Sequence, residues 1–213
     1  MVCTIRLVNT KSVANLTEAD PVMAELSKRL GPVRLKPRRL PPFQSLAHAI
    51  IHQQLSGQAA GTILGRFQAL FDGSRFPRPE DVIQADVERL RTAGLSRQKA
   101  TYIRDLAQKT IDGAVPSLKE CDSLTDAEIV ERLTSIKGVG RWTVEMLLIF
   151  NQGRPDILPV HDLGVRRGFQ VAYRKRKLPE PEQLERYGRK WMPYRTTAAW
   201  YLWRTADFLE GKW

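Results

Sequence analysis

The sequence predicts an all-α protein of about ten helices joined by short loops. Three observations lead to this fold class. Apolar residues recur at intervals of three and four along most of the chain, which is the spacing of one face of a helix. Ser, Thr and Asp residues stand directly before several of these stretches, where they can cap a helix. Alternation of apolar and polar residues, which is the pattern of a strand, is scarce.

The N-terminal part of the chain predicts two helices separated by a connector. The first covers residues 21–30, because Asp20 can serve as its N-cap and Pro21 fits its first turn. Residues 31–42 cannot form one helix, since four prolines interrupt them, and an extended basic connector is expected instead. A helical pattern then begins at Phe43.

Capping residues delimit the helices in the middle of the chain. Ser56 can cap the helix that follows it, and Ser96 can cap a helix from Arg97. Thr125 begins the pattern Thr-Asp-Ala-Glu, a capping box that opens a further helix. Helical patterns also occur around Val82 and over Val87–Ala93, Trp142–Phe150, Val165–Tyr173, Pro181–Trp191 and Thr196–Leu209.

Composition and charge limit the function classes. A hydrophobic fraction of 42% excludes a disordered chain. The 34 Lys and Arg residues exceed the 23 Asp and Glu residues by 11, which favours a polyanionic partner: nucleic acid first, an anionic membrane surface second. Apolar runs stay far below the ~18 residues of a membrane span. We therefore expect a nucleic-acid partner and no membrane partner.

The two cysteines, Cys3 and Cys121, are too few for a disulfide framework, a four-cysteine zinc site or a four-cysteine iron–sulfur cluster. They indicate a reducing compartment. The first residues lack the apolar region of a secretory signal. The expected location is intracellular: the cytoplasm or nucleoid, or the nucleus in a eukaryote.

The most informative local pattern lies at Leu133–Thr143, where two glycines around one apolar residue separate two helical stretches. It predicts a helix-hairpin-helix over about residues 133–150, whose turn directs the first amides of the second helix outward. Such amides form an anion site suited to a DNA phosphate. An ordinary helix–helix corner is the alternative, but the flanking cations favour phosphate binding. The residues assigned to this site are Lys137, Gly138, Val139, Gly140 and Arg141.

This turn resembles the helix-hairpin-helix of DNA repair glycosylases, and three other blocks extend the resemblance. Residues 43–56 resemble the first barrel helix of that superfamily. A Gly- and Pro-containing loop at 151–159 precedes Asp162, which matches the catalytic aspartate. Residues 191–203 resemble the C-terminal signature of the 3-methyladenine DNA glycosylase II branch. The four blocks occur in the family's order and cover the chain from Phe43 to Trp203.

The resemblance implies a monofunctional DNA glycosylase of base excision repair. It would flip an alkylated, 3-methyladenine-type base out of the duplex and hydrolyse the N-glycosidic bond. Asp162 would stabilise the oxocarbenium-like sugar and orient the attacking water, and it also suits a helix N-cap. Trp142 and Trp203 match base-pocket positions, with a core role as the alternative. Met146 stands where relatives place a pocket tyrosine.

The same resemblance assigns a minor-groove wedge to the polar break after the first barrel helix. Gln54 is the favoured wedge residue, with Leu55 and then Gln53 as further candidates. The alternative is an interhelical loop with Leu55 in the core. Arg195 and the pair Arg166–Arg167 either meet DNA or form a solvated basic face. The run Arg174–Lys177 is expected to be solvated, with weak phosphate contacts.

Two departures from the family pattern narrow the reaction. Relatives that also cut the DNA backbone carry a lysine two residues after the second glycine, where this chain has Trp142, so lyase activity is not expected. No cysteine follows Cys121, which argues against the C-terminal iron–sulfur cluster of other relatives. No cofactor and no catalytic metal is expected. The one ion that the resemblance allows is a monovalent cation at the hairpin.

The expected architecture is two helical lobes with a DNA-binding cleft. Residues 43–157 would form a barrel-like lobe that contains the hairpin, and residues 1–42 with 158–213 a second lobe that carries Asp162 near the cleft. The expected partner is double-stranded DNA with damaged bases, bound by a monomer. A non-catalytic helix-hairpin-helix DNA-binding protein and a bifunctional glycosylase/lyase remain the alternatives.

Overall fold

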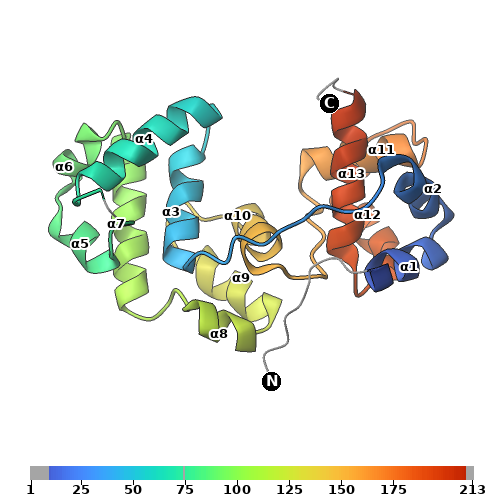
Figure 1. The fold of residues 1–213 in the computed structure, drawn as a ribbon, viewed down its shortest axis with the longest axis horizontal. Helices are drawn as coiled ribbons and strands as arrows, with labels where there is room; N and C mark the ends of the chain where they lie inside the picture. The colour runs from blue at the N-terminus through green and yellow to red at the C-terminus, as the bar shows by residue number, and fades with distance from the viewer. Residues whose placement is uncertain (1–9, 74, 210–213) are drawn as a thin grey trace. The chain divides into compact units, whose positions relative to one another are not determined.

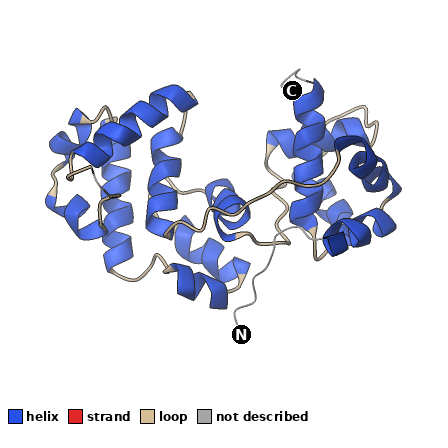
Figure 2. Cartoon of the chain, viewed as in Figure 1, coloured by secondary structure: helices blue, strands red, loops and turns tan. Residues whose placement is uncertain are grey.

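The computed structural model describes residues 10–73 and 75–209, so Cys3 lies outside the described part of the chain. These residues form helices and loops, and none of them is in a strand (Figures 1 and 2). The predicted all-α fold class is therefore confirmed for the described residues. Among them, no helix has the length and apolar character needed to cross a bilayer.

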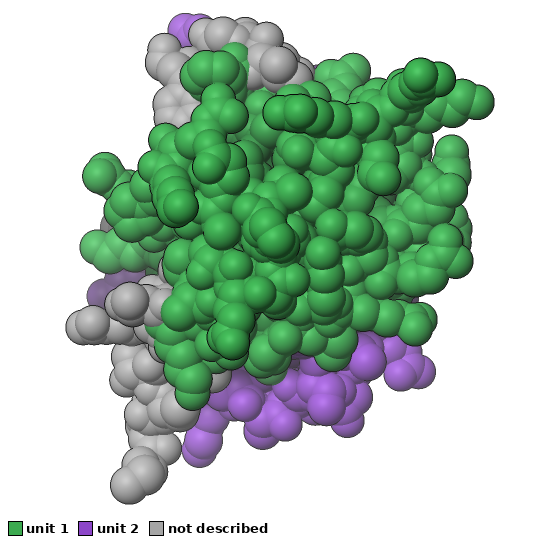
Figure 3. Space-filling model, turned by 90° about the vertical axis from the view of Figure 1, so that its right-hand side faces the viewer, with its two compact units in different colours: residues 1–38, 148–213 green, residues 39–147 purple. Residues whose placement is uncertain are grey.

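The chain divides into two compact units, which Figure 3 colours separately. Unit 1 consists of residues 1–38 and 148–213, and unit 2 of residues 39–147. The sequence-based division instead ended the hairpin lobe at residue 157. Residues 148–157 belong with unit 1, and several contacts join them to α13: the Phe150 and Trp203 rings lie 5.5 Å apart, and Asp156 pairs with Arg195.

Unit 2 is organised around α7 (Arg97–Ile111). The helices that pack on α7 are α3 (Pro42–His52), α5 (Pro79–Gln84) and α6 (Val87–Thr92). Two further pairs pack in this unit: α4 (Gly57–Ala69) on α3, and α9 (Asp126–Thr134) on α10 (Arg141–Met146). Ala100, Ile103 and Leu106 of α7 are fully buried, as their helical spacing predicts.

Unit 1 is organised around the contact of α11 (Leu163–Ala172) with α13 (Arg195–Leu209). Gly168 allows this close approach, because a Cβ atom there would overlap the backbone of Leu202. The remaining elements are α1 (Thr10–Ala19), α2 (Pro21–Leu30), α12 (Pro181–Gly188) and the 3-10 helix η2 (Arg189–Trp191). Both α1 and α2 pack on α13.

The predicted caps are confirmed. The Ser56 side chain accepts from the Ala59 amide, and the Ser96 side chain accepts from the Lys99 amide. Thr125 and Glu128 form the reciprocal hydrogen bonds of a capping box. These caps satisfy amides that lack partners within their helices, and they fix where α4, α7 and α9 begin.

The structure differs from the sequence prediction in three elements. Helix α1 and the short α8 (Leu118–Ser123) were not predicted. The segment predicted as one helix over Trp142–Phe150 is helical throughout, but its second part is not α-helical: α10 gives way to a π-helix, η1 (Leu147–Gln152). A π-turn holds one residue more than an α-turn. The side chains beyond Met146 therefore no longer follow the three-and-four-residue spacing of an α-helix, which was the basis of the prediction.

A buried carboxylate, Asp20, connects distant parts of unit 1. It caps α2 through the Val22 amide, and its Oδ2 accepts from the Tyr173 hydroxyl at 2.6 Å and from Trp191 Nε1 at 2.9 Å. Lys190 Nζ lies 3.0 Å from the same oxygen. Burial alone would raise the pKa of Asp20, but the bonds from these side chains outweigh it and hold the pKa below its usual value.

Candidate functional site

Asp162 is the N-cap residue of α11 in unit 1. Its Oδ1 accepts a hydrogen bond from the Val165 amide at 2.9 Å, and its own amide donates to the Pro159 carbonyl. The carboxylate is half-buried. The start of α11 therefore holds this carboxylate in a fixed orientation.

Trp203 on α13 contacts the same carboxylate. Its indole Nε1 donates to Asp162 Oδ1 at 2.8 Å, so this oxygen accepts two hydrogen bonds. Gly164 leaves room for the contact, since a Cβ atom there would lie 3.0 Å from Trp203 Cδ1 and 3.1 Å from Asp162 Oδ1. The ring of Trp203 also packs on Phe150, which is 38% exposed. The α11–α13 packing thus joins a carboxylate to an aromatic surface.

The loop before Asp162 is held by side chains of α13. Arg195 binds Asp156 through Nε at 2.8 Å and Nη2 at 2.9 Å. Thr196 Oγ1 accepts from the Ile157 amide and donates to the Arg154 carbonyl. Arg195 is therefore engaged in an internal ion pair rather than in a solvated basic face.

Three further features of unit 1 differ in exposure. His161 is exposed beside Asp162. Trp191 is a core residue, with 1% of its surface accessible. The run Arg174–Lys177 is exposed at the end of α11.

The hairpin turn between α9 and α10 lies in unit 2 and is packed against α7. Gly138 has a φ of 80°, and a Cβ atom there would overlap the Tyr102 ring, so only glycine fits this position. The Lys137 amide donates to Asp105 Oδ2 at 2.9 Å. Two residues of α7 therefore fix the conformation of the turn.

The second helix of the hairpin begins at an open position. Gly140 is its N-cap residue, supplies no side-chain acceptor, and has open space where a Cβ atom would be. Val139 is buried, so its side chain packs inward. Arg141 is exposed and pairs with the buried Glu145 at 3.0 Å. The first amides of α10 thus lie at an uncrowded helix start, which suits an anion.

The polar segment after α3, which begins at Gln53, contacts this hairpin directly. Gln53 Nε2 donates to the Gly138 carbonyl at 2.8 Å. Lys99 Nζ donates to the carbonyls of Ile51 and Gln53, and burial lowers the pKa of this lysine. Gln54, by contrast, has a φ of 57° and is exposed. The Gln53 side chain is thus engaged inward, while the next residue faces outward.

Leu55 is 40% exposed, so the alternative that places it in the core is wrong. Trp142 is also exposed, at 50%, and Met146 is half-buried; both lie in unit 2, whereas Asp162 and Trp203 lie in unit 1. Sequence reasoning missed the contacts made by Lys99 and Tyr102. No local pattern signals them, because their partners lie about 35 to 50 residues away in the chain.

Within the described residues, no cluster of three or more His, Cys, Asp or Glu side chains is placed to hold a metal ion. Cys121 is buried and unbonded to another cysteine.

The profile of the HhH-GPD superfamily of base excision DNA repair proteins matches residues 47–194. The chain belongs to this superfamily. It is 38% identical to DNA-3-methyladenine glycosylase 1 of Schizosaccharomyces pombe over 94% of this chain and 89% of that protein. It is 34% identical to the alkylbase DNA glycosidase-like protein mag2 of the same organism, over 89% of this chain and 90% of the relative.

Solved structures agree with this assignment. The S. pombe 3-methyladenine DNA glycosylase in complex with abasic DNA superimposes with a TM-score of 0.79 over 93% of this chain and 97% of that one, at 38% identity. A DNA-3-methyladenine glycosidase from Bacillus halodurans gives a TM-score of 0.87 at 34% identity, over 96% and 93%. The family resemblance inferred from the four sequence blocks is thus confirmed.

Proposed function

We propose that this protein is a monofunctional DNA glycosylase that removes alkylated, 3-methyladenine-type bases from double-stranded DNA in base excision repair. The observation that carries the proposal is the carboxylate of Asp162, held at the start of α11 by the Val165 amide and the Trp203 indole. The similarity to 3-methyladenine glycosylases over nearly the whole chain supports the substrate class.

The reaction breaks the bond between the sugar C1′ and the base nitrogen. The bonding electron pair leaves with the base, and a purine alkylated at N3 or N7 is cationic, so it departs as a neutral molecule. Positive charge then develops on the sugar, where Asp162 stabilises it electrostatically. Water adds to C1′ and loses a proton, which leaves an abasic site. The fixed orientation of Asp162 lowers the reorganisation needed in this step.

The aromatic side chains suit recognition of the cationic base. Trp203 adjoins Asp162 and is assigned to the base pocket, because an indole face attracts a cation. Trp142, half of whose surface is exposed, and Met146 are assigned to base recognition on the sequence resemblance alone. Phe150 packs on Trp203 and extends this aromatic surface.

The hairpin is assigned to the DNA backbone. The amides of Gly140 and Arg141 would bind a phosphate, Lys137 would add positive charge, and Gly138 and Val139 would hold the turn. Gln54 is assigned as the wedge that fills the gap left by the flipped nucleotide, with Leu55 beside it. The exposure of both residues supports this assignment, and the inward bond of Gln53 makes it a supporting residue.

One feature of the sequence favours a water-dependent, monofunctional reaction. Trp142 stands where lyases of the family carry the lysine that forms a Schiff base, and an indole cannot form one. No metal or cofactor enters the proposed steps. A monovalent cation held by backbone carbonyls of the hairpin is kept as a proposal, although the Gly138 carbonyl already accepts from Gln53. We place the enzyme inside the cell, where its DNA substrate is.

The test is release of 3-methyladenine from methylated duplex DNA by the wild type and by Asp162→Asn. Asparagine keeps an oxygen for the Val165 and Trp203 donors but loses the charge, so we expect intact folding and a rate at least about a hundredfold lower. No release by the wild type would refute the enzyme assignment and favour a DNA-binding protein. Borohydride trapping of a covalent DNA adduct would instead favour a glycosylase/lyase.

A further inference from the structure

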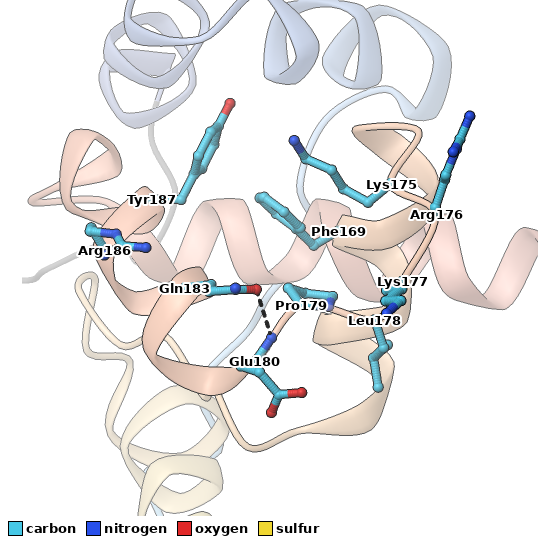
Figure 4. A pocket seen from close by; sticks show the side chains of 10 residues that line it. All are labelled: Phe169, Lys175, Arg176, Lys177, Leu178, Pro179, Glu180, Gln183, Arg186 and Tyr187. Carbon is cyan, nitrogen blue, oxygen red and sulfur yellow. Dashed lines mark hydrogen bonds between the residues drawn. The ribbon is translucent and has the colours of Figure 1, made fainter.

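A pocket of about 900 Å³ lies in unit 1 between the end of α11 and α12 (Figure 4). Its volume is in the range that holds an organic ligand rather than a single inorganic ion. Phe169 comes from α11, and Gln183, Arg186 and Tyr187 come from α12. Residues 175–180 of the connecting segment complete the lining.

Four cations surround this pocket: Lys175, Arg176, Lys177 and Arg186. All four are exposed, and within the described part of the chain none of these side chains pairs with a carboxylate. The lining contains one carboxylate, Glu180, which lies 3.7 Å from Arg166 outside the pocket. The lining therefore holds four cations against one carboxylate, which is a local excess of positive charge.

The cations are spread around the pocket instead of converging on one point. Figure 4 shows Arg186 and Arg176 on opposite sides of it, while the Lys175 side chain extends over Phe169. The amide of Glu180, at the start of α12, is already bonded to Gln183 Oε1 at 3.1 Å. This arrangement suits several separate single charges along an extended chain better than one phosphate, which needs converging donors.

The floor of the pocket is apolar. Phe169, Leu178, Pro179 and the Tyr187 ring line it. Lys190 Nζ lies 4.0 Å from the centre of the Tyr187 ring and covers one of its faces. A backbone phosphate gains nothing from such a surface, whereas a buried apolar side chain does.

The position of the pocket separates it from the proposed reaction. Asp162 caps the N-terminal end of α11, and the basic segment follows the C-terminal end of that ten-residue helix. At 1.5 Å per residue the two ends are about 15 Å apart. A ligand can therefore occupy the pocket without reaching the carboxylate.

We propose that this pocket binds an acidic peptide segment of a partner protein, with carboxylates on the Lys175, Arg176 and Arg186 side chains and one apolar side chain on the Phe169–Tyr187 floor. Charge complementarity selects the acidic chain, and the apolar floor fixes its register.

The experiment measures fluorescence anisotropy of a short fluorescein-labelled glutamate-rich peptide with one central phenylalanine, mixed with the full-length protein. Two comparison peptides replace the glutamates by glutamine, or the phenylalanine by serine. The test variant is Lys175→Glu with Arg186→Glu. The matched control is Lys28→Glu with Arg29→Glu, which has the same net charge and places both changes on exposed residues at the end of α2.

We expect the pocket variant to bind the acidic peptide at least about tenfold more weakly than the wild type, and the control variant to lose less than about threefold. Both comparison peptides should bind more weakly than the probe. Excision of 3-methyladenine should be equal in all three proteins, so this result is independent of the proposed activity.

Three outcomes would overturn the proposal. The first is no binding of the acidic peptide by the wild type. The second is an equal loss in the control variant, which would indicate nonspecific attraction to a basic protein. The third is tighter binding of a single-stranded oligothymidylate with the same charge as the peptide, if the pocket variant weakens this binding and the control variant does not. That result would make the pocket a nucleic-acid site.

Discussion

Replacing Trp203 with phenylalanine would remove the indole N–H that donates to Asp162 Oδ1 at 2.8 Å while keeping an aromatic ring beside Phe150. The Val165 amide would remain as the other donor to that oxygen. A hydrogen bond to a charged group contributes about 1.5–3 kcal/mol. Because Asp162 is half-buried and keeps one donor, we expect the lower end of this range, which corresponds to roughly a tenfold slower excision step.

The assay is single-turnover release of 3-methyladenine, with binding to a duplex that contains an abasic-site analogue measured in parallel. Trp200→Phe is the matched control, since Trp200 lies on the same helix, packs against the core of unit 1, and has ring contacts with the Tyr201 and Arg204 side chains. The excision rate should fall for Trp203→Phe and stay near wild type for the control, with DNA affinity little changed in both.

A double-mutant cycle separates positioning from packing. If Trp203 acts by orienting Asp162, its replacement should have little further effect in an Asp162→Asn background. Equal and independent losses in the two backgrounds, or a wild-type rate for Trp203→Phe, would refute the positioning role. The ring would then act only as a wall of the base pocket.

Three further predictions concern the hairpin and the core of unit 1. Gly138→Ala should destabilise the protein by about 2–4 kcal/mol, because it combines a left-handed φ with overlap of a packed ring, whereas Gly140→Ala should unfold near the wild-type denaturant midpoint. Similar midpoints for both would contradict this account. Lys137→Ala should reduce the slope of log K against log salt for duplex binding by about 0.9, and an unchanged slope would remove Lys137 from the phosphate contact. The folded-state pKa of Asp20 lies below its unfolded value, so its stabilisation is present above about pH 4 and is lost as the pH falls through the folded pKa. Denaturant unfolding of Asp20→Asn should lack that part of the acid dependence, and an identical acid profile would exclude Asp20 as its source.

Local signals predicted much of the fold. Ser56, Ser96 and Thr125 cap the helices that follow them, because a cap needs only a side chain and an amide two or three residues ahead. Helix α1 escaped prediction because it buries few apolar residues: Leu16 is buried, and so is the polar Ser12.

The candidate site was only partly predictable, because its contacts join residues that lie far apart in the chain. The family blocks identified Asp162 and Trp203 separately, but the hydrogen bond between them spans 41 residues and depends on how α11 packs on α13. The bond of Asp20 to Trp191 spans 171 residues. Periodicity relates neighbours within one helix, so contacts between distant elements leave no trace in it.

The bond from Gln53 to the Gly138 carbonyl also bears on how the enzyme searches DNA. It ties the segment with the exposed Gln54 to the turn assigned to the backbone, and both belong to unit 2. If Gln54 is the wedge and the turn binds a phosphate, as proposed, the side chain in the base stack would stay at a constant offset from that phosphate. The wedge and the phosphate contact would then move along DNA together, as one rigid piece.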